Sequence, residues 1–156
     1  GVLATEGTIL SNSYPMEVKK LFPEIVITGQ ACPLWVPLVE NNEADSPGAD
    51  YFVKKYIDAL LENDPQIDTV ILGCTHYPLL LEKIQAYVPE GIKVICQGEY
   101  VAASLKDYLW RHPEMDERCS KDGQCRFYTT ESVEKFVNSA NLFLHESVEV
   151  LHTTLG

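Results

Sequence analysis

The segment from Thr69 to Leu80 constrains the fold more than any other part of the sequence. It opens with the apolar run Thr69-Val70-Ile71-Leu72, which does not alternate with polar residues and so predicts a strand covered on both faces. Pro78 suits the first turn of a helix, where a missing N–H costs nothing. Gly73-Cys74-Thr75-His76 stands between the two. The segment therefore predicts a buried strand that ends near a thiol and is followed at once by a helix.

Predicted strands and helices alternate along most of the chain, which favours an α/β fold with a parallel sheet. A turn is expected at Glu6-Gly7, and the polar stretch 112–124 is expected to be a loop. Helix 47–63 is predicted from a Ser46-Pro47 start and from apolar residues at three-and-four spacing. The remaining predicted elements are strands in 2–5, 69–72, 93–96 and 125–130, a strand that begins at 25–28 and leads into Ala31-Cys32, helices in 15–22, 98–111 and after Ser132, and a short edge strand within 147–155.

Cys74 is the main candidate for chemistry. The start of a helix favours the thiolate form of a cysteine, and its free N–H groups can also bind a carboxylate. The alternative is that Cys74 is a small buried apolar residue, which is the usual role of a lone cysteine after a strand. Gly73 before it permits close approach of a ligand, and a core position needs neither Thr75 nor His76 beside it. This context favours a catalytic cysteine.

Polar or reactive residues follow four of the predicted strands: Thr5, Cys32, Cys74 and Gln97. The carboxyl ends of parallel strands lie along one edge of a sheet, where open α/β folds bind their ligands. We therefore expect these residues to gather at one site. Cys32 is nevertheless expected to be a core residue rather than a second base.

Composition excludes several classes of function. A net charge of −11 argues against nucleic-acid binding, and no apolar run approaches the length that crosses a membrane. Five widely spaced cysteines fit a reducing cytoplasm better than a disulfide framework. Cys119 and Cys125 lack the spacing of a zinc site, so no metal is expected. No lysine stands in an obvious pyridoxal-phosphate context, so no cofactor is expected either.

Three blocks of the sequence carry a resemblance to a known family. Gly73-Cys74-Thr75-His76-Tyr77-Pro78-Leu79-Leu80 resembles the segment around the second catalytic cysteine of the glutamate racemases, which are cofactor-independent members of the aspartate/glutamate racemase family. Gly1 to Thr8 resembles their substrate-binding strand and turn, and Ala31 to Glu40 resembles a segment that ends in a glutamate. His76 is typical of the glutamate enzymes, because aspartate racemases have Glu there. The resemblance extends over essentially all 156 residues.

The resemblance implies an isomerase that interconverts L-glutamate and D-glutamate by cysteine acid/base chemistry and supplies D-glutamate for peptidoglycan, and hence for the cell wall and cell shape. Cys74 would remove the α-proton of L-glutamate, and His76 would tune the ionisation of the thiol. Glu40 would have an orienting or proton-shuttling role near the active site. In the alternative reading, His76 caps the helix and Glu40 is a solvated carboxylate.

Three threonines are implied as substrate-binding residues: Thr75, Thr5 and Thr8. Thr75 would donate to the substrate from beside the catalytic thiol. Thr5 and Thr8 match the hydroxyls of the family's first block; the alternative is that both simply close a turn. The implied partner is therefore the small molecule glutamate, and a homodimer is expected.

The resemblance also suggests that this chain is a C-terminal portion. Family members are longer and carry an Asp-Ser-Gly turn, a first catalytic cysteine and a Cys-Asn-Thr block, none of which is present. Residues 1–98 would form the Cys74-bearing lobe, lacking its first strand, of an incomplete α/β/α sandwich. Residues 99–156 would return to the other, mostly absent lobe. Such a chain should be inactive alone. Two alternatives stay open: a one-cysteine enzyme of the superfamily, such as a decarboxylase or cis–trans isomerase, and a non-catalytic binding module.

Overall fold

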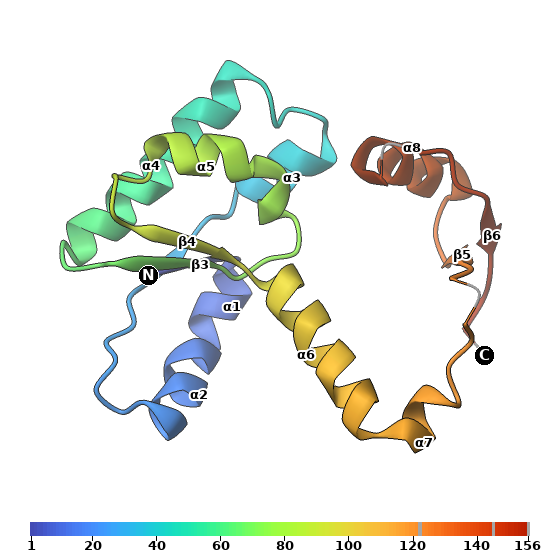
Figure 1. The fold of residues 1–156 in the computed structure, drawn as a ribbon. Coiled ribbons are helices and arrows are strands. Elements are labelled where there is room, and N and C mark those ends of the chain that lie inside the picture. The colour runs from blue at the N-terminus through green and yellow to red at the C-terminus, as the bar shows by residue number, and fades with distance from the viewer. Residues whose placement is uncertain (122, 145, 156) are drawn as a thin grey trace. The chain divides into compact units, whose positions relative to one another are not determined.

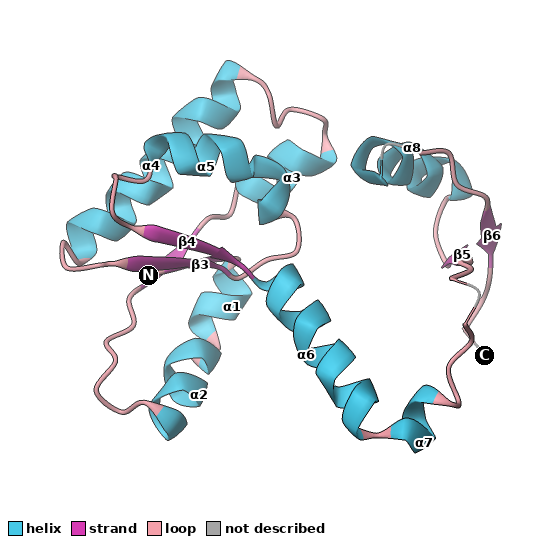
Figure 2. Cartoon of the chain, in the orientation of Figure 1, coloured by secondary structure: helices cyan, strands magenta, loops and turns pink. Residues whose placement is uncertain are grey.

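The structure is a computed structural model that describes residues 1–121, 123–144 and 146–155. Helices and strands alternate along the chain, as Figures 1 and 2 show. The chain divides into two compact units, Gly1–Ala103 and Ser104–Gly156. Among the described residues, no helix is both long enough and apolar enough to cross a membrane.

The first unit is built on a four-stranded parallel sheet. Its strand order is β2-β1-β3-β4, and every neighbouring pair runs parallel. Leu3 in the centre of β1 lies opposite Gln30 on one side and Leu72 on the other. This sheet confirms the predicted parallel α/β fold. The strands are β1 (Val2–Ala4), β2 (Gly29–Ala31), β3 (Thr69–Leu72) and β4 (Lys93–Cys96).

Helices lie on both sides of this sheet (Figure 1). One side carries α3 (Trp35–Glu40), α4 (Pro47–Asn63), the 3₁₀ turn η1 (Tyr77–Leu80) and α5 (Leu81–Tyr87). The other side carries α1 (Glu6–Leu10) and α2 (Ser13–Leu21). The chain leaves β4 directly into α6 (Gln97–Arg111).

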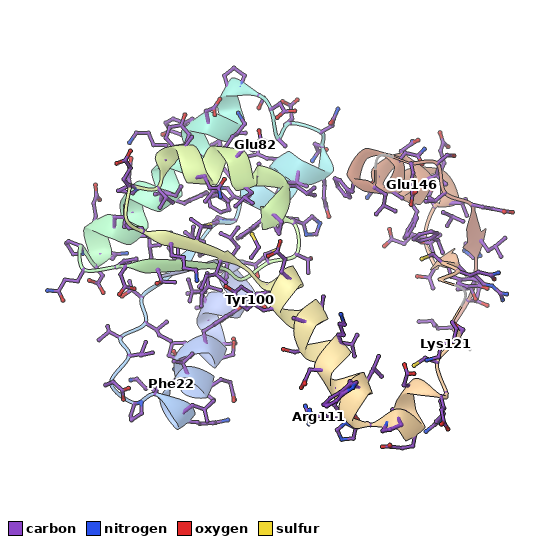
Figure 3. All side chains as sticks on the ribbon, in the orientation of Figure 1. Phe22, Glu82, Tyr100, Arg111, Lys121 and Glu146 are labelled. Carbon is purple, nitrogen blue, oxygen red and sulfur yellow. The ribbon has the colours of Figure 1, made fainter. Side chains whose placement is uncertain are left out.

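The hydrophobic core of this unit lies on the side of α3, α4 and α5. The largest fully buried side chains there are Trp35, Tyr77, Leu3, Ile57, Leu60, Leu72, Leu80 and Ile84. By contrast, α1, α2 and α6 contain no buried residue. Large side chains such as Phe22 and Tyr100, labelled in Figure 3, are exposed. The two sides of the sheet are therefore unequally covered.

Strand β3 reflects this inequality. Val70 and Leu72 are only 1% and 2% exposed, whereas Thr69 and Ile71 on the opposite side are partly exposed. The prediction that this strand is covered on both faces is therefore wrong. Burial accounts for the apolar residues on one face of β3 only, since α1 and α2 on the other side bury none of their own residues. The apolar run therefore also reflects the high β propensity of its residues.

Helix α4 begins where the sequence predicted. The Ser46 side chain accepts a hydrogen bond from the Ala49 N–H at 3.2 Å, and Pro47 occupies the first turn. Val53, Ile57 and Leu60 then form part of a buried stripe facing the sheet. The capping serine and the three-and-four spacing together specify this helix.

Three local predictions differ from the structure. The strand predicted to begin at 25–28 and lead into Ala31 begins only at Gly29, where its pairing with β1 starts. The expected turn at Glu6 is instead the short helix α1, whose first backbone bond runs from the Ile9 N–H to the Thr5 carbonyl at 3.0 Å. The expected loop 112–124 contains the one-turn helix α7 (Pro113–Asp116), which starts at a proline.

The second unit holds a strand–helix–strand motif. Strand β5 (Phe127–Thr129) pairs in parallel with β6 (Val150–His152), and α8 (Val133–Leu144) connects them. The Ser132 side chain accepts from the Lys135 N–H at 3.3 Å, which confirms the predicted helix start. Among the described residues of this small unit, Ala140 and Val150 are buried.

Candidate active site

The candidate site lies where the strand order reverses. From β1 the chain goes to β2 on one side and then to β3 on the other, so the carboxyl ends of β1 and β3 flank the switch point of the sheet. Open α/β sheets bind their ligands at this position. Thr5 directly follows β1, Cys74 follows β3 after one glycine, and Gln97 follows β4. The prediction that these strand ends share one edge is confirmed.

Gly73 allows the loop after β3 to lie close to β1. Its N–H donates to the Leu3 carbonyl at 2.8 Å. A Cβ at this position would meet the Ala4 Cβ at 3.0 Å, Tyr14 Oη at 3.2 Å and the Leu3 oxygen at 3.3 Å. Two of these contacts are with β1 itself, which cannot move without disturbing the sheet. Glycine therefore fixes the distance between Cys74 and the neighbouring strand end.

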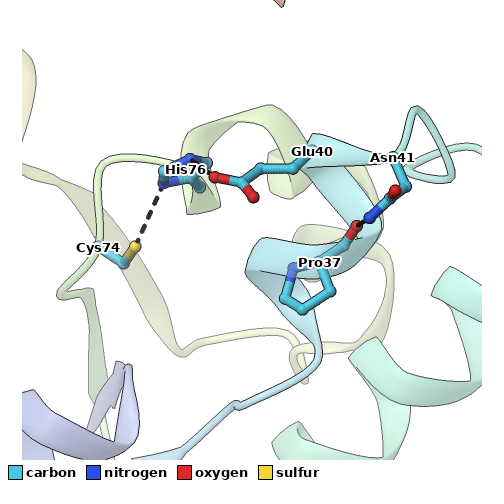
Figure 4. A network of polar contacts seen from close by, with 5 residues as sticks. All are labelled: Pro37, Glu40, Asn41, Cys74 and His76. Atoms are coloured by element: carbon cyan, nitrogen blue, oxygen red, sulfur yellow. Dashed lines mark hydrogen bonds and ion pairs between the residues drawn. The ribbon is translucent and has the colours of Figure 1, made fainter. Parts of the chain in front are cut away.

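Cys74, His76 and Glu40 form a chain of polar contacts, drawn in Figure 4. Cys74 Sγ lies 3.8 Å from His76 Nδ1, and His76 Nε2 lies 3.4 Å from Glu40 Oε1. The imidazole thus has the thiol on one nitrogen and a carboxylate on the other. Such an arrangement can move a proton to and from sulfur while the carboxylate orients the ring. The structure brings the three predicted catalytic residues together.

Glu40 reaches this position from the last turn of α3. The next residue, Asn41, donates from its side-chain amide to the Pro37 carbonyl at 2.7 Å and so ties down the end of the helix (Figure 4). Val39, beside Glu40 in the sequence, is buried in the core. The carboxylate therefore extends from an anchored helix end rather than from a loose loop.

A pocket of about 280 Å³ opens beside the thiol. Among the described residues, none that lines it carries a formal charge, and Cys74 is the only thiol there. Among the residues that the structure describes, no cluster of three His, Cys, Asp or Glu could hold a metal ion. The lining residues are Tyr14, Leu72, Gly73, Cys74, Thr75, Pro78, Gln97 and Gly98.

The three predicted substrate-binding threonines lie in two places. Thr75 lines the pocket next to Cys74 and is exposed. Thr5 Oγ1 and Thr8 Oγ1 are hydrogen-bonded to each other at 3.0 Å and are not among the lining residues. Thr8 instead lines a smaller cavity of about 140 Å³, which shares Tyr14 with the pocket. The Thr5–Thr8 pair therefore lies next to the site, with its hydroxyls already paired.

Buried groups behind the loop hold it in place. The Tyr77 hydroxyl donates to the Cys32 carbonyl at 3.2 Å, and the Tyr77 ring meets the Trp35 ring edge-on at 4.7 Å between centroids. Burial raises the pKa of the Tyr77 phenol and that of the Cys32 thiol above their ordinary values. Cys32 is 0% exposed, which confirms the prediction that it is a core residue.

Sequence reasoning missed Tyr14 and the flanking Pro78 and Gly98 as pocket residues. Pro78 carries only the signal of a helix start, and Gly98 lies in the first turn of α6. Tyr14 comes from the first turn of α2, so it carries no strand-end signal. Only the close packing of α2 against Gly73 places its hydroxyl at the site.

Several known proteins with similar sequences are glutamate racemases. The chain is 34% identical over 156 residues to the glutamate racemase of Thermoanaerobacter sp. (strain X514) and 36% identical over 155 residues to that of Streptococcus mutans serotype c. Each alignment covers 99% of this chain. The chain spans only 58% of the length of each of these relatives.

Solved structures of glutamate racemases also match this chain. The crystal structure of a glutamate racemase from Bacillus anthracis matches with a TM-score of 0.86 at 34% identity, covering 99% of this chain and 57% of that one. The Francisella tularensis glutamate racemase in complex with D-glutamate matches with a TM-score of 0.84 at 28% identity, covering 100% of this chain and 57% of that one. The family model described as Asp/Glu/Hydantoin racemase matches residues 1–105. The chain therefore belongs to the Asp/Glu/hydantoin racemase family.

Proposed function

We propose that the full-length protein interconverts L-glutamate and D-glutamate without a cofactor, and that Cys74 is one of its two acid/base groups. The observation that carries the proposal is the Cys74–His76–Glu40 chain, which lies beside a pocket at the switch point of the sheet. The similar proteins named glutamate racemase support the choice of substrate.

The geometry suggests how the thiol becomes a base. His76 Nδ1 can accept the thiol proton, while the Glu40 carboxylate, 3.4 Å from Nε2, stabilises the imidazolium that forms. The thiolate then takes the α-proton of L-glutamate. In the opposite direction, the Cys74 thiol returns a proton to the same face of the α-carbon. Glu40 acts through His76 and is therefore a positioning residue.

Neutral hydrogen-bond donors would bind the substrate. Since no charged residue lines the pocket, the substrate carboxylates would be held by hydroxyl, amide and backbone N–H groups. Thr75 lines the pocket beside Cys74 and would donate to the α-carboxylate. Thr5 and Thr8 would contribute by exchanging their mutual bond for one to the substrate.

Inversion needs a second acid/base group on the other face of the α-carbon. Cys32 is not suited to this role, because its buried thiol keeps its proton and donates to the Gln30 carbonyl at 3.6 Å. We therefore expect the 156-residue chain alone not to racemise glutamate. The full-length enzyme would act as a homodimer in the cytoplasm and supply D-glutamate for peptidoglycan. The five free cysteines are consistent with a reducing compartment.

Deuterium exchange at the α-carbon tests this assignment. The full-length protein is incubated in D₂O with each glutamate enantiomer, and exchange and inversion are followed by NMR and polarimetry. Cys74→Ser should reduce inversion by more than about 100-fold, the contribution of a positioned acid/base group. His76→Asn and Glu40→Gln should cause smaller losses that change the pH profile.

Cys119→Ser is the matched control, because Cys119 is an exposed thiol outside the pocket. It should keep the full rate. Near-normal inversion by Cys74→Ser would disprove the role of this thiol. Absence of exchange with both enantiomers in the unmodified protein would disprove the proposed reaction and favour a decarboxylase, another isomerase or a binding module.

A further inference from the structure

Tyr14 brings a hydroxyl group to the pocket from outside the strand ends. It lies in the first turn of α2 and lines the pocket together with Cys74 and Gln97. Its Oη lies 3.2 Å from the position that a Cβ on Gly73 would occupy. The hydroxyl is therefore packed against the residue that directly precedes the catalytic thiol.

The hydrogen bonds of Gln97 fix the role of this hydroxyl. Gln97 Nε2 donates to the Leu72 carbonyl at 3.1 Å and to Tyr14 Oη at 2.5 Å. A carbonyl only accepts, so the end of the Gln97 side chain that faces Leu72 must be its NH₂ group. Both amide hydrogens are then used, and Tyr14 Oη is the acceptor in its bond with Gln97.

The phenolic hydrogen of Tyr14 remains available. An NH₂ group of an amide does not accept a hydrogen bond, so this hydrogen cannot be directed at Gln97. Among the residues that the structure describes, Tyr14 Oη forms no other hydrogen bond. A donor that borders the pocket and has no protein acceptor is suited to an acceptor on a bound ligand.

We propose that Tyr14 donates its phenolic hydrogen to a carboxylate oxygen of the amino acid bound beside Cys74, and that Gln97 positions it. This inference rests on the proposed function, because the reaction requires a carboxylate substrate in this pocket. A neutral donor is needed there, since no Lys or Arg lines the pocket. A hydrogen bond from a neutral donor to a charged acceptor is also stronger than one between neutral groups.

Two variants separate direct contact from a structural role. Tyr14→Phe removes the donor and keeps the ring, whereas Gln97→Leu removes the support and keeps the donor. In the full-length protein, Tyr14→Phe should lower kcat/KM for glutamate by about 10- to 100-fold, the value of a hydrogen bond to a charged group. Gln97→Leu should cause a smaller loss, and the double variant should match Tyr14→Phe. Tyr51→Phe, which removes an exposed hydroxyl on α4, should keep the full rate.

A chemical substitution gives a readout that packing alone would not change. Replacement of Tyr14 by 3,5-difluorotyrosine preserves the shape of the side chain, but the fluorinated phenol ionises at lower pH. The alkaline limb of kcat/KM should therefore move to lower pH, because an ionised phenol cannot donate.

Three results would overturn the inference: Tyr14→Phe with nearly full kcat/KM, Tyr14→Phe losing no more than Gln97→Leu, or an unmoved alkaline limb. Each requires an unmodified enzyme that racemises glutamate. An unmodified enzyme with no exchange would instead refute the proposed function.

Discussion

Replacement of Cys32 by alanine should change how stability depends on pH. The Cys32 side chain is 0% exposed, and burial raises the pKa of its thiol above the ordinary value. The folded protein therefore keeps the Cys32 proton at pH values where the unfolded chain releases it. Below the pKa of the unfolded thiol both states are protonated, and stability is unaffected. Above it, stability falls as pH rises.

The size of this change in the free energy of unfolding follows from the single proton that the unfolded chain releases and the folded protein keeps. An unfolded thiol has a pKa of about 8.5, and each further pH unit then costs about 1.4 kcal/mol of unfolding free energy. Between pH 8 and pH 10 the unmodified chain should lose about 2 kcal/mol more than Cys32→Ala. At pH 7 the variant should itself be less stable by about 1 kcal/mol, because a small buried group is removed.

Urea unfolding followed by tryptophan fluorescence provides the assay. Trp35 is 0% exposed and contacts the ring of Tyr77, so its emission reports the first unit, whereas Trp110 is 80% exposed already. Titrations in reductant at several pH values between 8 and 10 give the slope of the unfolding free energy against pH for the unmodified chain and for Cys32→Ala. Cys119→Ala controls for the loss of an exposed thiol. Equal slopes for the unmodified chain and Cys32→Ala would refute the argument from burial.

Two further changes test the support of the site. Tyr77→Phe should lower the free energy of unfolding by only about 1 kcal/mol, because the Cys32 carbonyl keeps a second hydrogen bond from the backbone N–H of Trp35 at 3.2 Å. A loss above about 3 kcal/mol in urea titrations would contradict this reading. Ser46→Ala should cost about 1 kcal/mol by removing the cap on the Ala49 N–H, and Ser46→Asp should restore it; equal stability of the two variants would show that the cap is unimportant.

The sheet could be predicted where local signals agreed. Strand β3 is bounded by Gly73 and follows the predicted helix 47–63, so its ends were clear from the sequence. The stretch 25–28 has the same β-branched composition, yet the strand begins only at Gly29, because the three residues of β1 pair in register with 29–31. The composition of a segment indicates its β propensity, whereas its pairing depends on the length of the neighbouring strand.

The site could be predicted only in part. Cys74 and His76 are two residues apart, so the sequence itself places them together. Glu40 was identified only through the family resemblance, because its approach to His76 depends on how α3 packs. Tyr14 was missed for the same reason, since its partner Gln97 is 83 positions away. Long-range contacts of this kind leave no local pattern.

The two thiols of the first unit show how position decides chemistry. Cys32 and Cys74 both follow strands of one sheet and differ by a single glycine in their distance from the strand end. Cys32 comes directly after β2, so its N–H continues the ladder by donating to the Ala4 carbonyl at 2.9 Å, and its side chain stays in the core. Cys74 comes one residue later, beyond Gly73, and its side chain emerges beside His76. Since a buried thiol retains its proton, the role of base that we propose belongs to the second position and not to the first.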